Sequence, residues 1–215
     1  MSQETELLWV KDPTKGRRTI KNSVRAYASA SQILTWLKDV SKGWSYRERK
    51  EELRKRDLAL IAFIYLLALR ESEAIRIKKG QFRLEPESNM WRVQGIELSK
   101  VRSLTNPKWR ERHDKYREGW LPLRARDPAR REMVKMVLDY AKDLGPDAVL
   151  FPMTGRRVQQ IVGSYTQGWP HYFRMAGLMY LYKAWGYDVV ALSNYVKVDV
   201  RTLMHYLGHV TREAV

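Results

Sequence analysis

The chain has 215 residues, enough for one large domain or two small ones with a buried core. It carries 40 Lys and Arg against 24 Asp and Glu, a formal net charge of +16, and its 44% hydrophobic content excludes a disordered chain. A folded domain this basic favours a polyanionic partner, with nucleic acid the first candidate and an anionic membrane surface the second. The absence of cysteine excludes a disulfide framework, a thiolate metal site and a cysteine nucleophile.

Residues 1–22 are polar and basic, which predicts an N-terminal arm or linker before one domain over 23–215. Apolar residues at helical spacing predict a helix over 23–41. The charged stretch 45–56 leads directly into an apolar run at 58–69, so we expect one helix with a solvated start and a buried end. This run is too short to span a bilayer, and the sequence predicts no membrane segment.

Short segments with strand character follow at 81–84, 91–98 and 120–123. A long basic connection, 99–119, separates the second strand from the third. Between residues 100 and 135 there are twelve Lys and Arg against five Asp and Glu, which indicates a surface that contacts a polyanion.

The last part of the chain is predicted to be helical. Asp127-Pro128 is an N-cap followed by proline in the first turn, and Gly145 ends the helix that starts there. Thr154 starts another helix, which residues 168–170 (Gly-Trp-Pro) end. Further helices are predicted over 171–185, 188–196 and 199–207. The fold class is therefore α+β, mostly α-helical, with a small antiparallel sheet.

Polar residues interrupt the apolar helical faces at three places. Arg70 closes the apolar run, and Glu73, one helical turn further on, could hold its guanidinium. His171 and Arg174 share one face at a helix start, where an anion is favoured. Tyr206 lies near the C-terminus. Taken singly, these are most simply a structural ion pair, a surface histidine with a solvated arginine, and a packing tyrosine; their order along the chain suggests a joint role.

That order resembles the catalytic domain of the tyrosine recombinases, the phage-integrase family. The apolar helix that ends in Leu-Arg-Glu-Ser-Glu at 69–73 resembles the family's first box, and His-Tyr-Phe-Arg at 171–174 matches its H-x-x-R box. The resemblance covers residues 25–212. It implies the tyrosine-recombinase catalytic-domain fold and a site-specific recombinase or integrase that cuts and rejoins DNA.

Two alignments compete for the family's last box, in which a histidine is followed about nine residues later by the nucleophilic tyrosine. With His209 at the histidine position, the tyrosine would fall beyond residue 215. With Lys197 there, Tyr206 follows nine residues later, and Lys197 itself follows His171 by 26 positions, which fits the family spacing. We prefer the second alignment, in which Lys197 departs from the usual histidine.

The family also uses a lysine in the hairpin between its second and third strands. Lys100 is the best match here, Lys108 is an alternative, and a basic DNA-contacting loop without a catalytic lysine is a third interpretation. We expect the remaining basic residues of this region and of the helix after Thr154 to contact DNA. They are Arg102, Lys108, Arg110, Arg112, Lys115, Arg156 and Arg157.

The resemblance implies a reaction in which Tyr206 attacks a DNA phosphate and forms a 3′-phosphotyrosyl intermediate. Arg70 and Arg174 would hold the phosphate oxygens, since guanidinium forks bind them bidentately. His171 would donate a hydrogen bond or move a proton, and Lys100 would protonate the leaving 5′-oxygen. No metal or other cofactor is implied. Alternative hypotheses are a type IB topoisomerase-like enzyme that relaxes DNA and a non-catalytic DNA-binding relative.

The implied partner is a double-stranded DNA attachment site, on which family members assemble as homo-tetramers; the free chain is expected to be a monomer. Family members normally have a separate DNA-clamping domain, for which residues 1–22 are too few, so we expect either a fragment or an unusually small member. The composition suits an integrase of archaeal or archaeal-virus type, from a mobile element. We expect the protein in the host cytoplasm, associated with the nucleoid.

Overall fold

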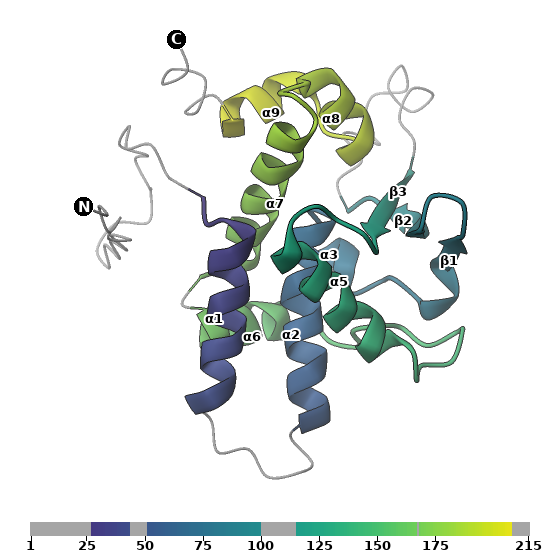
Figure 1. Cartoon of the computed structure of the whole chain (residues 1–215), viewed down its shortest axis with the longest axis vertical. Helices are drawn as coiled ribbons and strands as arrows, with labels where there is room; N and C mark the ends of the chain where they lie inside the picture. Colours follow the sequence, from purple (N-terminus) through teal and green to yellow (C-terminus); the bar gives the residue numbers. More distant parts are fainter. Residues whose placement is uncertain (1–26, 44–50, 100–114, 167, 208–215) are drawn as a thin grey trace, which may run out of the picture.

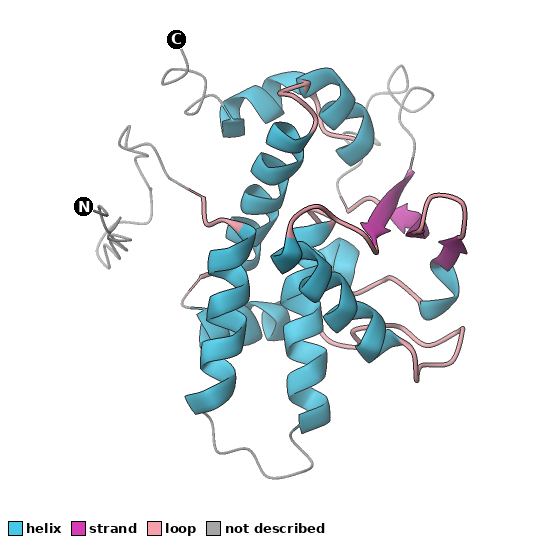
Figure 2. Cartoon of the chain, in the orientation of Figure 1, coloured by secondary structure: helices cyan, strands magenta, loops and turns pink. Residues whose placement is uncertain are grey.

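A computed structural model of the chain describes residues 27–43, 51–99, 115–166 and 168–207 (Figure 1). The described part is mostly helical, with one small sheet at its edge (Figure 2). The elements, in chain order, are α1 (Ala30–Gly43), α2 (Glu51–Leu66), α3 (Glu71–Ala74), η2 (Lys79–Gln81), β1 (Phe82–Glu85), β2 (Met90–Glu97), β3 (Tyr116–Pro122), α5 (Pro128–Ala141), α6 (Gly155–Thr166), α7 (Pro170–Ala184), α8 (Val189–Val196) and α9 (Val200–Leu207).

Helix α1 begins at Ala30, later than the predicted start at residue 23. Ser29 and Gln32 form a reciprocal cap there: the Ser29 backbone N–H donates to Gln32 Oε1 (2.8 Å), and the Gln32 N–H donates to Ser29 Oγ (3.2 Å). A capping box of this kind satisfies two of the free N–H groups at a helix start. The helix therefore begins where the Ser-x-x-Gln pattern places it, because apolar spacing alone does not define an end.

Helix α2 is the centre of the fold, and residues 59–69 are all buried. It packs against α5, α6 and α7. Its described part starts charged and ends buried, as predicted, but the helix ends at Leu66 rather than at residue 69. Ala68 has a left-handed backbone (φ 49°), and the N–H groups of Ala68 and Leu69 donate back to Tyr65 and Ile64. This is a Schellman motif with alanine at the position that glycine usually takes.

Helix α7 runs very close to the end of α2. Gly177 makes this approach possible, because a Cβ there would lie 2.1 Å from the Tyr65 carbonyl oxygen. Beyond this contact, α7 carries a second, smaller apolar core against α8 and α9, around Leu178, Leu192 and Leu203. Figure 1 shows α8 and α9 together at one end of α7.

The sheet is antiparallel, in the order β1-β2-β3. Val93 pairs with Gly119 and Ile96 with Arg117, so β2 has a bulge between Val93 and Ile96, where Gly95 has a φ of +62°. Strand β3 begins at Tyr116, four residues before the predicted start. The charged residues at its beginning, which predicted a connection, are part of the ladder.

Helix α5 begins as predicted, because the Asp127 carboxylate accepts from the Ala129 N–H at 2.9 Å. It ends at Ala141, before the predicted stop at Gly145. Helices α6 to α9 lie within one or two residues of their predicted ranges.

Candidate active site

The site is built around Glu73, which is fully buried in the short helix α3. Arg70, directly before α3, donates its backbone N–H to Glu73 Oε2 (2.9 Å) and its Nη1 to Glu73 Oε1 (2.7 Å). The Arg70 side chain is 23% exposed. The predicted Arg70–Glu73 contact is therefore present, and it holds both the backbone and the guanidinium of Arg70 while part of the side chain stays exposed.

Arg174 reaches the same carboxylate from α7. Its Nη1 lies 3.6 Å from Glu73 Oε2 and donates to the Ala68 carbonyl oxygen. Arg174 is only 2% exposed, so the interpretation of this residue as a solvated surface arginine is wrong. Glu73 thus joins Arg70 and Arg174, which are a hundred residues apart in sequence.

Three arginines from different elements close the C-terminal end of α2. The carbonyl groups of residues 66–68 lie where a helix ends and its carbonyl groups lack helical N–H donors. Each of the three accepts a hydrogen bond from one guanidinium group. The pairs are Leu66 with Arg130 (3.3 Å), Leu67 with Arg117 (2.8 Å) and Ala68 with Arg174. These cations also complement the partial negative charge at a helix C-terminus.

The buried charged groups shift one another's pKa values. Burial alone would raise the pKa of Glu73, but attraction to Arg174, then Arg117, and the Arg70 hydrogen bond lower that pKa below its ordinary value. Burial, followed by repulsion from Arg70, lowers the pKa of Arg174 to about 9, although Glu73 opposes the shift. At neutral pH the cluster therefore holds one carboxylate among charged guanidinium groups.

Tyr206 and His171 lie beside this cluster. The ring centroids of His171, at the start of α7, and Tyr206, in α9, are 5.7 Å apart with an interplanar angle of 70°. Tyr206 is also close enough to Arg174 for the two side chains to interact electrostatically. His171 is exposed and Tyr206 is half-buried, so both can meet a ligand from solvent. The structure therefore brings Tyr206 to both residues of the predicted H-x-x-R box.

The predicted lysines occupy different places. Lys197 is exposed and has a left-handed backbone (φ 52°) at the C-cap of α8, in the turn that leads to α9. Lys100 lies outside the described residues. Ser99, directly before it, has its Oγ 3.5 Å from Glu73 Oε1, so the end of β2 reaches the Arg70–Glu73 pair.

The predicted DNA-contacting residues are described only in part. Lys115, Arg156 and Arg157 are exposed. The start of α6, which carries the two arginines, lies beside α3, since Gln159 donates to Glu71 (3.1 Å). The others, Arg102, Lys108, Arg110 and Arg112, lie outside the described residues, as does His209 of the rejected alignment.

Arg117 is a residue of this cluster that the sequence analysis missed. Its side chain is 1% exposed and its Nη2 lies 3.8 Å from Glu73 Oε2. Arg117, Gly119 and Leu121 alternate along β3 on the buried side of the sheet. That period of two, continued back from Leu121, is the signal that could have placed Arg117 in the core.

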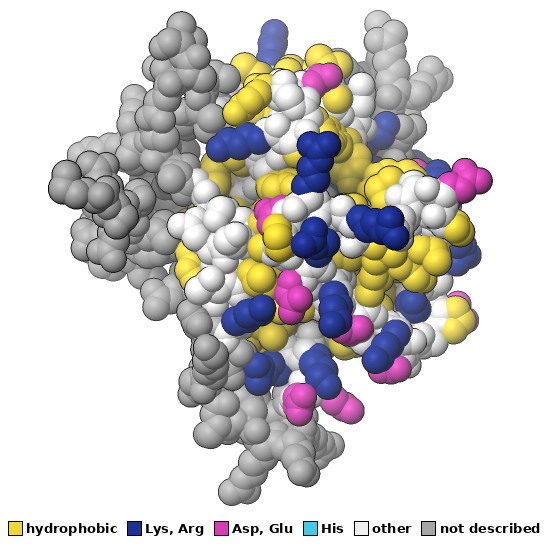
Figure 3. All heavy atoms as spheres, in the orientation of Figure 1, with side chains coloured by type: hydrophobic (Ala, Val, Ile, Leu, Met, Phe, Trp, Pro, Cys, Tyr) yellow, Lys and Arg dark blue, Asp and Glu magenta, His cyan; other side chains and the backbone are white. Residues whose placement is uncertain are grey.

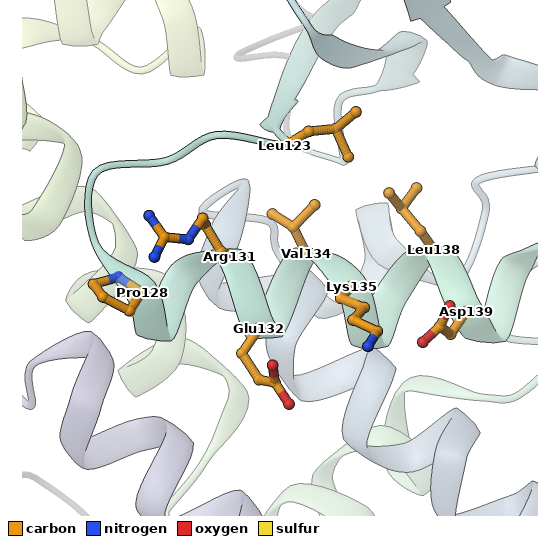
Figure 4. A pocket seen from close by; sticks show the side chains of 8 residues that line it. All are labelled: Leu123, Pro128, Arg131, Glu132, Val134, Lys135, Leu138 and Asp139. Atoms are coloured by element: carbon orange, nitrogen blue, oxygen red, sulfur yellow. The ribbon is translucent and has the colours of Figure 1, made fainter.

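Figure 3 shows Lys and Arg scattered over the described part of one face, with Asp and Glu among them. A hollow of about 540 Å³ lies beside α5 (Figure 4), and neither Arg70 nor Glu73 is among the residues that line it. It is lined by Leu123, Pro128, Arg131, Glu132, Val134, Lys135, Leu138 and Asp139.

Within the ranges that the structure describes, none of the helices combines the length and the apolar character needed to cross a bilayer. No group of three His, Asp or Glu side chains within those ranges is placed to hold a metal ion.

Comparison with known proteins gives a match at the level of structure. No family model matches the sequence, and no curated protein matches it. The chain is similar to XerH site-specific recombinase bound to palindromic difH substrate in a post-cleavage complex (TM-score 0.57, 16% identity, 90% of this chain). It is also similar to XerH bound to difH substrate in a pre-cleavage complex (TM-score 0.55, 17% identity, 88% of this chain). In both comparisons it spans 52% of the recombinase chain. The chain therefore has the mostly helical fold, with a small antiparallel sheet, of a tyrosine-recombinase catalytic domain.

Proposed function

We propose that the chain is a site-specific DNA recombinase or integrase that acts through a 3′-phosphotyrosyl intermediate. The observation that carries this proposal is the convergence on one site of Arg70, Arg174, His171 and Tyr206. The XerH proteins of the same fold are site-specific recombinases bound to DNA, which supports the assignment.

In the proposed reaction the Tyr206 oxygen attacks a phosphorus of the DNA backbone. The bond from phosphorus to the tyrosine oxygen forms, the bond to the 5′-oxygen breaks, and Lys100 gives that oxygen a proton. Arg70 and Arg174 stabilise the negative charge that builds on the phosphate oxygens, because fixed cations in a partly buried site act strongly on it. A second 5′-hydroxyl reverses the step and rejoins the strands.

The remaining roles follow from position. His171 donates a hydrogen bond to the phosphate or accepts the Tyr206 proton, since the two rings are in contact. Lys197 donates to a phosphate oxygen from the turn before α9, and its left-handed backbone is the kind of local strain that functional sites retain. Lys115, Arg156 and Arg157 hold the DNA backbone.

We propose that the protein works as a homo-tetramer on two double-stranded attachment sites, in the host cytoplasm at the nucleoid, as part of a mobile element of archaeal or archaeal-virus type. Residues 1–22 are an arm and 23–215 the catalytic domain. The molecular mass of the protein–DNA complex in solution tests the tetramer.

The deciding experiment traps the covalent intermediate. Duplexes that the protein binds are selected from a random pool and rebuilt as nicked suicide substrates, from which the cleaved end diffuses away. Wild type should form a protein–DNA adduct. Tyr206→Phe should bind the same duplex and form none, whereas Tyr187→Phe, an exposed tyrosine elsewhere in the chain, should behave as wild type.

Each other outcome has a definite meaning. An adduct that persists in Tyr206→Phe removes Tyr206 as the nucleophile. Binding without any adduct favours a non-catalytic DNA-binding protein. Relaxation of supercoiled plasmid with no sequence requirement favours a type IB topoisomerase-like enzyme.

The role of the hairpin lysine has its own test. A substrate with sulfur in place of the leaving 5′-oxygen needs no proton donor, because a thiolate leaves readily. It should restore cleavage to Lys100→Ala but not to Arg174→Ala. Rescue of Lys108→Ala instead would move the role to Lys108.

A further inference from the structure

Arg117 is a buried arginine for which the proposed reaction has no direct use. It extends from β3 into the core, where its side chain is 1% exposed. Its Nη2 donates to the Leu67 carbonyl oxygen (2.8 Å) and lies 3.8 Å from Glu73 Oε2. Arg117 therefore touches both the end of α2 and the carboxylate that holds Arg70 and Arg174.

Arg117 also contacts the element that leads to the tyrosine. Its guanidinium lies over the ring of Tyr195, in α8, at 5.7 Å from the centroid. The Tyr195 hydroxyl oxygen accepts from the Trp120 backbone N–H of β3 at 3.2 Å. Helix α8 is followed directly by Lys197 and then by α9, which carries Tyr206. The contact with Tyr195 therefore links β3 to the segment that carries these two residues.

We infer that Arg117 is a positioning residue: its positive charge keeps the Glu73 carboxylate ionised and fixed at the end of α2, so that Glu73 can hold Arg70 and Arg174 in place. The inference rests on the proposed function for its catalytic consequence. Its electrostatic part concerns Glu73 alone and is testable without DNA.

The charged groups around Glu73 support this role. They are Arg70 before α3, Arg117 from β3 and Arg174 from α7, with the Ser99 hydroxyl at the end of β2. The nearby α6 contact falls on Glu71 instead. Burial raises the pKa of Glu73, and Arg117 is one of the cations whose attraction reverses that shift. Without Arg117, Glu73 should therefore take up a proton at a higher pH.

Three variants separate charge from structure. Arg117→Met removes the charge and keeps much of the volume, whereas Arg117→Lys keeps the charge. Within the described residues only Nη2 of Arg117 finds an acceptor, so a lysine can supply the same charge without the fork. Arg130→Met is the matched control, because Arg130 is 3% exposed and donates to the neighbouring carbonyl of Leu66, yet forms no ion pair with Glu73 among the described residues.

The first measurement follows the Glu73 carboxyl by ¹³C NMR during a pH titration, with the signal identified by its loss in Glu73→Gln. The midpoint should move to higher pH in Arg117→Met and stay near the wild-type value in Arg117→Lys and Arg130→Met. A midpoint that does not move in Arg117→Met, or that moves equally in Arg130→Met, overturns the inference.

The second measurement is the single-turnover rate of adduct formation as a function of pH, at a temperature where each variant is folded. Arg117→Met should be about tenfold slower on the acidic side, with the acidic limb shifted to higher pH, and Arg117→Lys should restore the limb. A uniform loss at all pH values would mean a structural role only and would overturn the inference. If wild type forms no adduct, the proposed function fails, and the NMR titration still decides the role of Arg117.

Discussion

Replacing Gly177 with alanine tests how closely α7 must approach α2. The new Cβ would lie 2.1 Å from the Tyr65 carbonyl oxygen and 3.1 Å from its carbonyl carbon. Both are backbone atoms of a buried helix, so they cannot rotate out of the contact as a side chain could. Helix α7 must therefore move outward by about 1.3 Å or more before the contact reaches an ordinary van der Waals distance of about 3.4 Å.

The size of the effect follows from two opposing terms. Overpacking a rigid interface costs about 3 kcal/mol, while alanine gains about 1 kcal/mol over glycine within a helix, which leaves a net loss of about 2 kcal/mol. For a chain of this length that corresponds to a fall in Tm of about 4–8 °C. Gly163→Ala is the matched control, because among the described residues its Cβ would meet only the Gly168 carbonyl oxygen at 3.9 Å, and it should raise Tm by about 2 °C.

Thermal and urea unfolding, followed by circular dichroism, measure both variants against wild type. The folded Gly177→Ala protein should also cleave DNA more slowly, since the displaced helix carries His171 and Arg174. If Gly177→Ala unfolds at or above the wild-type temperature, as the control should, the close approach of the two helices is wrong.

Three further outcomes are expected. Glu73→Gln should lower the free energy of unfolding by about 3 kcal/mol at pH 7, because it leaves buried cations uncompensated. Since folding lowers the pKa of Glu73, its stabilising contribution is present above the ordinary carboxyl pKa and is lost as pH falls through the folded-state pKa. The variant should therefore lose less stability than wild type when unfolding is measured at decreasing pH. Asp127→Ala should cost about 1 kcal/mol in urea unfolding, because the Ala129 N–H loses its acceptor, and Asp127→Asn should cost less. Duplex affinity, measured by fluorescence anisotropy, should fall by about a thousandfold between 50 and 200 mM salt, and a flat salt response would contradict a basic DNA-binding surface.

The order of the helices and the Arg70–Glu73 contact could be predicted because each depends on local sequence. A cap such as Asp127-Pro128 acts within one turn, and Glu73 lies three residues from Arg70. The end of α2 could not be predicted in this way. The apolar run continues to residue 69, but the helix ends earlier because Ala68, which lies close to Gly177 of α7, takes a left-handed conformation that alanine does not indicate.

The burial of Arg117 and Arg174 could not be predicted from local sequence, for a related reason. Charged residues near a strand or helix start usually face water, so local pattern favours a solvated side chain. Here two open carbonyl groups at the end of α2 accept from the two guanidinium groups, and the Glu73 carboxylate forms an ion pair with each. Those acceptors lie 50 and 106 residues away in sequence, and only the tertiary fold brings them together.

The arginine-closed end of α2 also governs when the site can exist during folding. Its three contacts bridge 50, 64 and 106 residues, so each requires that a long loop has already closed. A full-length chain that is still partly unfolded would have its tyrosine but no assembled pair of cations around it. Under the proposed function, DNA cleavage would therefore begin only after these long-range contacts have formed.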